Sequence, residues 1–221
     1  MWDEPGPAPA RKYPRTHHLP DSPGATTDDR IVADLDGLTG ELVVTEKMDG
    51  GNVTFTRDLM YARSVDSGTH AWDRPAKALW ARVAHEIPYG WRICGESMWA
   101  RRSVAYSGLA GVFLVFAVWD TTHTLRSWDE TVEWAMLLEL PLVPVLHRGT
   151  DLATARAAWS RQRDADDSEG FVVRTAAPIP EAEFGRRVAK WVRPEHVRTE
   201  ASWRHRDDFA VNGFASADPT R

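Results

Sequence analysis

The chain has 221 residues, of which 43% are hydrophobic and 27% are charged, and its formal net charge is −5. This composition predicts a folded protein with one sizeable core or two small ones, and it excludes a largely disordered chain. The negative charge argues against a surface that coats nucleic acid throughout, because phosphate contacts are made by Lys and Arg. A local basic groove is compatible with it.

The cysteine content and the apolar runs limit the location of the protein. The single Cys94 excludes an internal disulfide and a multi-cysteine zinc site. The first thirty residues lack the apolar segment of a signal peptide. The longest apolar run, residues 108–119, is shorter than the roughly 20 residues that a transmembrane helix needs. We therefore expect a cytoplasmic protein without a membrane segment.

The two ends of the chain differ in pattern from its middle. Residues 1–24 contain six prolines and little periodicity, which predicts an extended arm. Residues 204–221 are polar and aperiodic, which predicts a flexible C-terminal tail. We expect residues 25–203 to form a single catalytic domain.

Strands and helices alternate irregularly through that domain. Gly50 and Gly51 predict a hairpin-like turn between the first two strands, and Asp73 is the expected N-cap of the first helix. Ser127 and Glu130 form an S-x-x-E capping box before the second helix. The irregular order favours an α+β fold with antiparallel sheets over a doubly wound fold. In chain order, the pattern predicts strands at 41–46 and 52–57, a helix at 73–87, strands at 91–96 and 112–119, helices at 131–140 and 151–162, and strands at 170–174 and 187–192.

The segment from Thr45 to Asn52 contains the strongest candidate for chemistry. It reads T-E-K-M-D-G-G-N, so Lys47 follows a β-rich run and precedes a glycine turn. A lysine at the end of a strand can point into a pocket, but a K-x-D-G pattern alone also occurs in surface turns. Its significance depends on the segments that follow it in the chain.

Four further segments follow in order: C-G-E at 94–96, V-F-A-V-W-D at 115–120, S-E-G-F-V-V-R at 168–174 and V-A-K-W-V-R at 188–193. With E-K-M-D-G-G-N at 46–52, this order resembles motifs I, III, IIIa, IV and V of the covalent nucleotidyltransferase superfamily of ligases and capping enzymes. The first motif is most similar to that of the RNA ligases related to the phage T4 RNA ligase 2 group. The resemblance extends from residue 45 to residue 193.

This resemblance implies an α+β, ATP-grasp-like ligase adenylylation domain of antiparallel sheets with flanking helices and no OB domain. It implies an ATP-dependent RNA ligase that joins 3′-hydroxyl and 5′-phosphate RNA ends through a lysine–AMP intermediate and an adenylated RNA end, in RNA repair. ATP and Mg²⁺ (or Mn²⁺) are the implied cofactors. RNA, including a nicked duplex or an RNA–DNA hybrid, is the implied partner, with RNA end-healing enzymes as further partners. The N-terminal arm either contacts RNA or packs on the domain.

The resemblance also implies site residues. Glu96 would hold the ribose hydroxyls, and Phe116 would stack on adenine, with Trp119 as its substitute. The implied catalytic residues are Lys47 and Lys190, the nucleotide-binding residues are Glu46, Lys47, Asn52, Arg63, Glu96, Phe116, Glu169 and Lys190, and the metal ligands are Glu169, Glu96 and Asp49.

Two of these assignments depend on details of the motifs. Arg63 would contact the nucleotide or the 5′-phosphate end, and Asn52 would position the RNA 5′-phosphate. The last motif commonly has the form K-x-K, whereas Val192 occupies the second lysine position here. Either Arg193 supplies the missing charge, or the site works with Lys190 alone.

The chemistry places a requirement on Lys47. Only a neutral amine can attack a phosphate, and the unperturbed pKa of lysine is near 10.4. We therefore expect burial, together with Lys190 or a metal ion, to lower the pKa of Lys47. Glu96 and Glu169 stand at strand ends beside glycine and are suitable oxygen ligands for hydrated Mg²⁺. The spacing of His17, His18 and His196 matches no standard metal site, so we interpret them as structural or surface residues.

Three alternatives are open at this point. An mRNA-capping guanylyltransferase or a DNA ligase normally carries an OB-fold domain after motif V, and the residues after Arg193 are too few for one. An NAD⁺-dependent ligase carries an extra N-terminal domain, whereas this chain begins with a short Pro-rich arm. A non-catalytic RNA-binding module of the same fold would be expected to lack Lys47, Glu96, Glu169 or Lys190, and all four are present.

Overall fold

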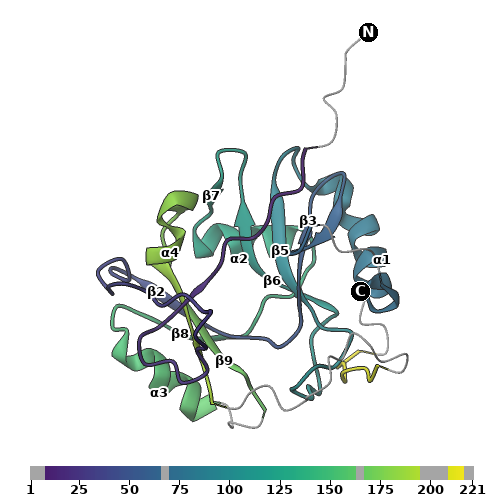
Figure 1. The fold of residues 1–221 in the computed structure, drawn as a ribbon. Coiled ribbons are helices and arrows are strands. Elements are labelled where there is room, and N and C mark those ends of the chain that lie inside the picture. The colour runs from purple at the N-terminus through teal and green to yellow at the C-terminus, as the bar shows by residue number, and fades with distance from the viewer. Residues whose placement is uncertain (1–7, 66–69, 163–166, 195–208, 217–221) are drawn as a thin grey trace.

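Two β-sheets form the centre of the molecule, and helices cover their outer faces (Figure 1). The structure is a computed structural model that describes residues 8–65, 70–162, 167–194 and 209–216. The predicted α+β class with antiparallel sheets and flanking helices is confirmed. His196 and most of the expected C-terminal tail lie outside the described residues.

The first sheet has five strands in the order β1-β11-β9-β2-β8. Its pairs are antiparallel except that β1 runs parallel to β11, with His17 opposite Ala189 and His18 opposite Lys190. Its strands are β1 (His17–His18), β2 (Leu42–Glu46), β8 (Val145–Gly149), β9 (Gly170–Thr175) and β11 (Val188–Val192).

The second sheet has six strands in the order β10-β7-β6-β5-β3-β4, and all its pairs are antiparallel. The chain enters this sheet directly after β2, so the turn that contains Lys47 lies where the two sheets meet. Its strands are β3 (Gly51–Phe55), β4 (Met60–Ala62), β5 (Arg92–Ser97), β6 (Phe113–Trp119), β7 (Thr124–Leu125) and β10 (Ile179–Pro180).

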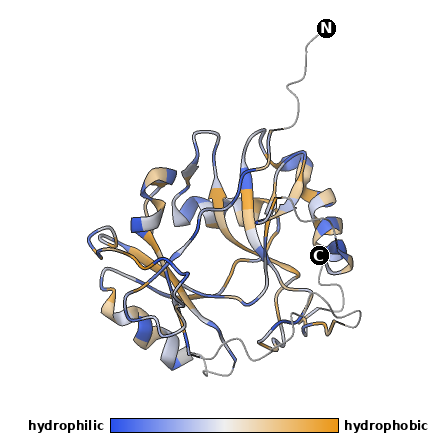
Figure 2. Cartoon of the chain, in the orientation of Figure 1, coloured by the Kyte–Doolittle hydropathy of each residue, from blue (hydrophilic) through white to orange (hydrophobic). Residues whose placement is uncertain are grey.

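The helices pack on the sheet faces that point away from the interior. Apolar residues of α1 (Arg74–Val83) and α2 (Trp128–Leu137) bury one face of β3, β5 and β6 in one cluster. Helix α3 (Ala153–Gln162) covers β2, β9 and β11 through Ala155 and Trp159. Figure 2 shows hydrophobic residues along the strands, whereas the helices carry both hydrophobic and hydrophilic residues. Short helical turns cover 71–73, 84–86 and 181–183, and α4 is Phe184–Arg187.

The alternation of side chains along the first sheet gives its two faces different roles. Val44, Phe171 and Trp191 face the helix side and pack in one buried cluster. Their neighbours in sequence, such as Val172 and Lys190, face the second sheet and line a pocket. Successive residues of a strand point to opposite faces, so the same three strands supply both a core and a site.

Most predicted elements are present with small shifts in their ends. The capping box is confirmed: the Glu130 N–H donates to Ser127 Oγ, and the Ser127 N–H donates to a Glu130 carboxylate oxygen. The helix it caps begins at Trp128 rather than at the predicted residue 131. Strands β1, β4, β7, β8 and β10 were not predicted, because two- and three-residue strands carry no periodicity and β8 has mixed polarity.

The described parts of the two chain ends pack on the domain. The N-terminal arm contributes β1 and therefore packs on the first sheet. Residues 209–216 were expected to be part of a flexible tail, but the buried Asn212 side-chain amide donates to Met98 O at 2.8 Å, and its Oδ1 accepts the Tyr106 N–H at 3.1 Å. Among the described residues, no helix has the length and apolar character needed to span a membrane.

Candidate active site

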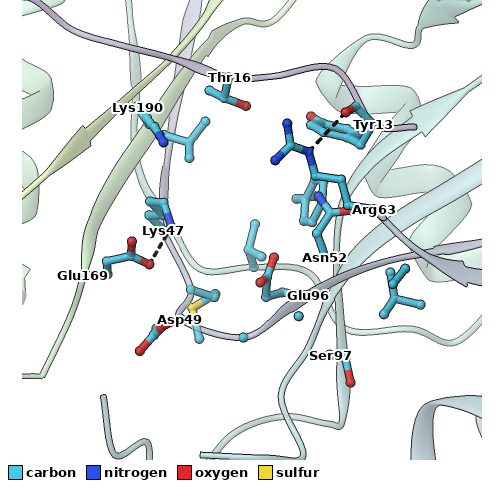
Figure 3. A pocket seen from close by; sticks show the side chains of 18 of the residues that line it. Tyr13, Thr16, Lys47, Asp49, Asn52, Arg63, Glu96, Ser97, Glu169 and Lys190 are labelled. Carbon is cyan, nitrogen blue, oxygen red and sulfur yellow. Dashed lines mark hydrogen bonds and ion pairs between the residues drawn. The ribbon is translucent and has the colours of Figure 1, made fainter. Parts of the chain in front are cut away.

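A pocket of about 950 Å³ lies between the two sheets. Figure 3 shows Lys47, Lys190, Glu96 and Arg63 around one open space. The structure brings all the predicted site residues to this pocket, although they come from six separate segments of the chain. Its lining includes Glu46, Lys47, Asp49, Asn52, Arg63, Glu96, Phe116, Glu169 and Lys190.

Lys47 immediately follows β2, and its backbone is fixed by a hydrogen bond from its N–H to Gly170 O at 2.9 Å. Its Nζ lies 2.5 Å from Oε2 of Glu169, the residue before β9 (Figure 3). Both side chains are largely withdrawn from solvent. The antiparallel pairing of β2 with β9 brings the end of one strand to the start of the other, which places the two groups together.

The expected lowering of the pKa of Lys47 is wrong for the ligand-free protein. Burial does act to lower it, but the nearby carboxylates of Glu169, Glu96 and Asp49 act in the opposite direction, and the net result is a raised pKa. Lys47 is therefore an ammonium ion paired with Glu169. A neutral amine at this position would require its surroundings to lose negative charge.

Asp49 fixes the turn after Lys47. One carboxylate oxygen, Oδ2, accepts the N–H groups of Ser103 and Val104 at 2.8 and 2.9 Å. The Asp49 N–H donates to the hydroxyl of Tyr106 at 3.0 Å. These three bonds tie the glycine turn to the loop after β5, so Asp49 is better placed to hold the turn than to offer both oxygens to a metal ion.

Glu96 and Asn52 are direct cross-strand neighbours on β5 and β3. Burial raises the pKa of Glu96 to about 7, and the nearby charges of Glu169 and Asp49 act in the same direction, against Lys47 and Arg102. In the part of the chain that the structure describes, Oδ1 of Asn52 is buried without a hydrogen-bond partner. The two side chains thus bring an excess of acceptor groups to the pocket wall.

Arg63 follows β4 and reaches the same wall. Its backbone N–H donates to Asn52 O at 3.0 Å, and its Nε donates to Tyr13 O at 3.3 Å (Figure 3). The backbone of Arg63 is thus tied to β3 and its guanidinium to the N-terminal segment, while the residue lines the pocket.

Phe116 supplies an aromatic surface to the pocket. It lies on β6, is partly buried, and meets Tyr13 edge to face, with 5.2 Å between the ring centroids. Trp119, its proposed substitute, is fully buried and packs against Tyr13 and Phe184. Trp119 is therefore part of the core, and Phe116 is the residue of this segment that a bound base can contact.

Lys190 lies on β11, and its Nζ is 3.8 Å from Asp29 Oδ1. Burial lowers its pKa, and the neighbouring charge of Lys47 lowers it further. Arg193 does not supply a second cation here, because it is buried and its Nε donates to Ser168 O at 2.8 Å. Val192 is buried, and Gly24 of the N-terminal arm lies against its side chain.

The structure adds pocket residues that the sequence did not reveal. Tyr13, Arg15, Thr16 and Asp29 come from the N-terminal segment, where no motif marks them. Arg174 is a different case, because it lies two residues after Val172 on β9 and alternation alone would place it on the pocket side. It is buried, and its Nη2 donates to Arg126 O.

The carboxylates of the pocket suit a hydrated divalent cation. No group of three or more His, Cys, Asp or Glu side chains that could hold a metal occurs within the described ranges. Mg²⁺, however, is usually held by one or two carboxylates together with substrate phosphates and water. Glu169 and Glu96 fit this role, because both face the pocket and a cation would relieve the unfavourable charge of Glu96.

Three comparisons place this geometry among known proteins. The sequence profile of the RNA ligase family matches residues 40–192. No curated protein sequence gives a significant match. Among solved structures, an archaeal ATP-dependent RNA ligase is 18% identical, with a TM-score of 0.59 over 83% of this chain and 48% of that chain.

Two further solved structures are similar. A putative ATP-dependent DNA ligase from Aquifex aeolicus is 18% identical, with a TM-score of 0.55 over 82% of this chain and 50% of its own. A Naegleria gruberi RNA ligase with pyrophosphate is 15% identical, with a TM-score of 0.50 over 84% of this chain and 61% of its own. The chain thus spans about half the length of the first two ligases, and at these identities the likeness establishes a shared nucleotidyltransferase-like ligase fold. With the family profile matched over more than half of its length, this chain belongs to the RNA ligase family.

Proposed function

We propose that the protein is an ATP-dependent RNA ligase that becomes adenylylated on Lys47 and joins 3′-hydroxyl to 5′-phosphate RNA ends, in RNA repair. The observation that carries the proposal is the placement of two lysines and two carboxylates, Lys47, Lys190, Glu96 and Glu169, around one pocket beside an aromatic surface. The form of the segment 46–52 supports a relationship to the phage T4 RNA ligase 2 group.

ATP enters with its base at Phe116 and its phosphates at the lysines. Stacking on an aromatic ring stabilises a bound base by about 1–3 kcal/mol. Glu96 accepts hydrogen bonds from the ribose hydroxyls, and Lys190 and Arg63 attract the α-phosphate. Glu46, a buried residue at the end of β2, lines the pocket beside the base and contributes to its recognition.

The first step transfers AMP to the protein. The neutral Nζ of Lys47 forms a bond to the α-phosphorus, the bond from that phosphorus to the bridging oxygen of the β-phosphate breaks, and pyrophosphate leaves with the electron pair. The amine loses its proton to solvent. In the second step an oxygen of an RNA 5′-phosphate bonds to the phosphorus of AMP, and the bond from that phosphorus to Lys47 Nζ breaks, so the lysine leaves as a free amine that takes up a proton. In the third step a 3′-hydroxyl bonds to the RNA 5′-phosphorus and loses its proton to solvent, and AMP leaves with the electron pair of the broken bond. Asn52 and Arg63 orient the RNA 5′-phosphate.

A divalent cation, Mg²⁺ or Mn²⁺, would be held by Glu169 and Glu96 together with the substrate phosphates, and it would supply positive charge that stabilises the transferring phosphoryl group. Engagement of Glu169 and Glu96 by such a cation would remove most of the negative charge that keeps Lys47 protonated. The pKa of Lys47 would then fall, because burial acts to lower it. This explains how an ammonium ion in the ligand-free protein becomes a nucleophile.

The direct test is incubation with ATP labelled on its α-phosphate, followed by denaturing electrophoresis. The wild-type protein should retain the label, and Lys47→Ala should not. Lys77→Ala is the matched control, because Lys77 is an exposed lysine on α1 outside the pocket, and it should label as the wild type does. Absence of label on the wild-type protein, or equal label on Lys47→Ala, contradicts the proposal.

Labelling, nick-sealing and RNA-binding assays together distinguish the rival activities. A capping guanylyltransferase would take label from GTP instead of ATP, and a DNA ligase would seal nicked DNA but not nicked RNA. A non-catalytic RNA-binding module would bind RNA without any label. A panel of end-labelled nicked RNA duplexes, RNA–DNA hybrids and single strands identifies the preferred substrate. Addition of RNA end-healing enzymes to the panel tests whether they provide the ends that the ligase joins.

A further inference from the structure

The N-terminal segment forms a wall of the pocket by crossing from one sheet to the other. The Arg11 N–H donates to the hydroxyl of Tyr61 on β4 at 3.1 Å, at the second sheet. Further along, β1 pairs with β11, at the first sheet. Between these anchors, Tyr13 and Thr16 line the pocket, and Figure 3 shows both beside Arg63 and Lys190. The segment is therefore part of the site.

At the phosphate end of this wall, one carboxylate meets three basic side chains. Oδ1 of Asp29 lies 3.8 Å from Lys190 Nζ, 3.3 Å from Arg15 Nη2 and 3.5 Å from His18 Nε2. All three groups lie within ion-pair range of Oδ1, but Lys190 and Arg15 are the charged ones, because His18 is neutral near pH 7.

The carboxylate itself is fixed by its own loop. Its other oxygen, Oδ2, accepts hydrogen bonds from the N–H and the hydroxyl of Thr26 at 3.1 and 2.9 Å. Although burial acts to raise the pKa of Asp29, these bonds and the charge of Lys190 lower it to about 2. The group is therefore ionised over the whole working pH range, with Oδ1 directed at the cations.

His18 does not compete for this charge. It is buried, and its Nδ1 is 2.8 Å from Ser22 Oγ. Burial and the nearby Lys190 lower the pKa of His18 to about 4, so the ring is neutral near pH 7. The histidine thus acts as a spacer that holds the loop against β11.

Lys190 needs such a partner because of the groups that face it. Lys47 from the end of β2 and Arg15 from the N-terminal segment repel its charge, whereas Asp29 and Glu169 attract it. In the proposed reaction Glu169 becomes engaged with a cation. Of these two carboxylates, Asp29 is then the one that remains available to Lys190.

From this geometry we propose that Asp29 is a positioning residue for lysine adenylylation, and that its carboxylate keeps the Lys190 ammonium charged and directed at the α-phosphate. The inference rests on the proposed function of the pocket. It assigns a working role to the N-terminal segment, which carries none of the motifs that identify the family. Asp29 acts through Lys190 and does not contact the reacting atoms.

The test compares Asp29→Asn with Asp21→Asn in single-turnover labelling by ATP across a pH series. Asp21 lies in the same segment, but its exposed carboxylate is paired with Arg156 at 3.4 Å and does not line the pocket. Asp29→Asn should lower the rate at saturating ATP by about tenfold, as expected when a charged group loses the partner that orients it. The alkaline limb of its profile should move to lower pH, because loss of the carboxylate lowers the pKa of Lys190. Asp29→Glu, which keeps the charge, should recover part of the rate.

Each outcome of this comparison either supports or overturns the role of Asp29. If Asp29→Asn matches Asp21→Asn, or if it loses rate with an unmoved alkaline limb, the inference is overturned while the proposed function stands. Urea unfolding of each variant shows whether a loss of rate reflects loss of fold. If Asp29→Asn does not fold, Asp29→Glu decides instead: an alkaline limb at the wild-type pH with part of the rate retained supports the inference, and a limb moved to lower pH overturns it. If the wild-type protein takes no label, the proposed function fails and the inference fails with it.

Discussion

Lys47 and Glu169 are 122 residues apart in the sequence, yet their side chains form a 2.5 Å ion pair between the two sheets. The pair neutralises the nucleophile with the carboxylate that the proposed mechanism assigns to a metal ion. In that mechanism, the cation and the protonated Lys47 compete for one carboxylate, so that binding of the cation favours the neutral amine. Until a cation engages Glu169, the proposed mechanism keeps the amine of Lys47 protonated.

Replacing Glu169 with Gln should separate these two roles. The pKa of Lys47 should fall, because a negative neighbour is lost while burial persists, so the amine should react faster with a neutral acylating reagent at pH 8. Adenylylation should nevertheless fall by about tenfold to a hundredfold, because a ligand of the cation is lost. Peptide mass spectrometry measures the acylation of Lys47. Asp167→Asn, an exposed acid two residues earlier, is the control. A less reactive Lys47 in Glu169→Gln contradicts this account.

Phe116→Leu should weaken ATP binding without unfolding the protein. Leucine keeps much of the apolar packing against Tyr13 but offers no ring for the base to stack on. Loss of a stacking interaction of about 1–3 kcal/mol corresponds to a rise of about fivefold to 150-fold in the ATP concentration needed for half-maximal labelling. Phe116→Tyr, which retains the ring face, serves as the matched control. An unchanged ATP dependence for Phe116→Leu would place the base elsewhere.

Glu96→Gln should stabilise the protein at high pH while it impairs adenylylation. Because the folded-state pKa of Glu96 is raised to about 7, the folded protein loses stability as pH rises from the ordinary carboxyl range to 7, and the ionised carboxylate is unfavourable above that. The glutamine variant should therefore gain about 1–2 kcal/mol in the free energy of unfolding at pH 8 and little at pH 5. Urea unfolding titrations in EDTA, at pH 8 and at pH 5, measure the two changes in the free energy of unfolding. Glu133→Gln, on the exposed face of α2, should show no such pH dependence.

Gly170→Ala should destabilise the fold and the site together. Gly170 has a φ of +154°, and an added Cβ would overlap the carbonyl oxygen of Trp191 on the neighbouring strand. We expect a loss of about 3 kcal/mol or more and a displaced Glu169. Gly40→Ala is the control, because Gly40 also has a positive φ, +75°, but open space around it. It should cost about 1 kcal/mol and leave labelling unchanged. Comparable losses in the two variants would rule out the steric argument.

The sequence predicted the long strands and helices because each carries its own periodicity. It also predicted that Lys47, Glu96, Phe116 and Lys190 belong to one site, because their segments follow a family order, and the structure brings them to one pocket. The strands of two or three residues could not be predicted from the sequence, since their pairing is decided by neighbours distant in sequence. β1 illustrates this, because its strand partner is β11, which lies about 170 residues later in the chain.

The charge state of Lys47 and the environment of Arg193 could not be predicted for a related reason. Whether a buried lysine is neutral depends on the balance between desolvation and the carboxylates around it, and that balance requires distances. Arg193 has the right position in the motif, but its guanidinium is bonded to Ser168 O and turned to the loop before β9. Local pattern identifies the type of residue, and the fold decides which way it points.

The parallel pairing of β1 with β11 has a consequence for synthesis. His18 faces a partner near residue 190, so the wall beside Lys47 cannot close until almost the whole domain has left the ribosome. Contacts of such long sequence separation form late, because a large loop must be ordered before they are made. A nascent chain that already contains Lys47 should therefore be unable to take up AMP. The ability to take up AMP should arise abruptly, when β11 pairs with β1.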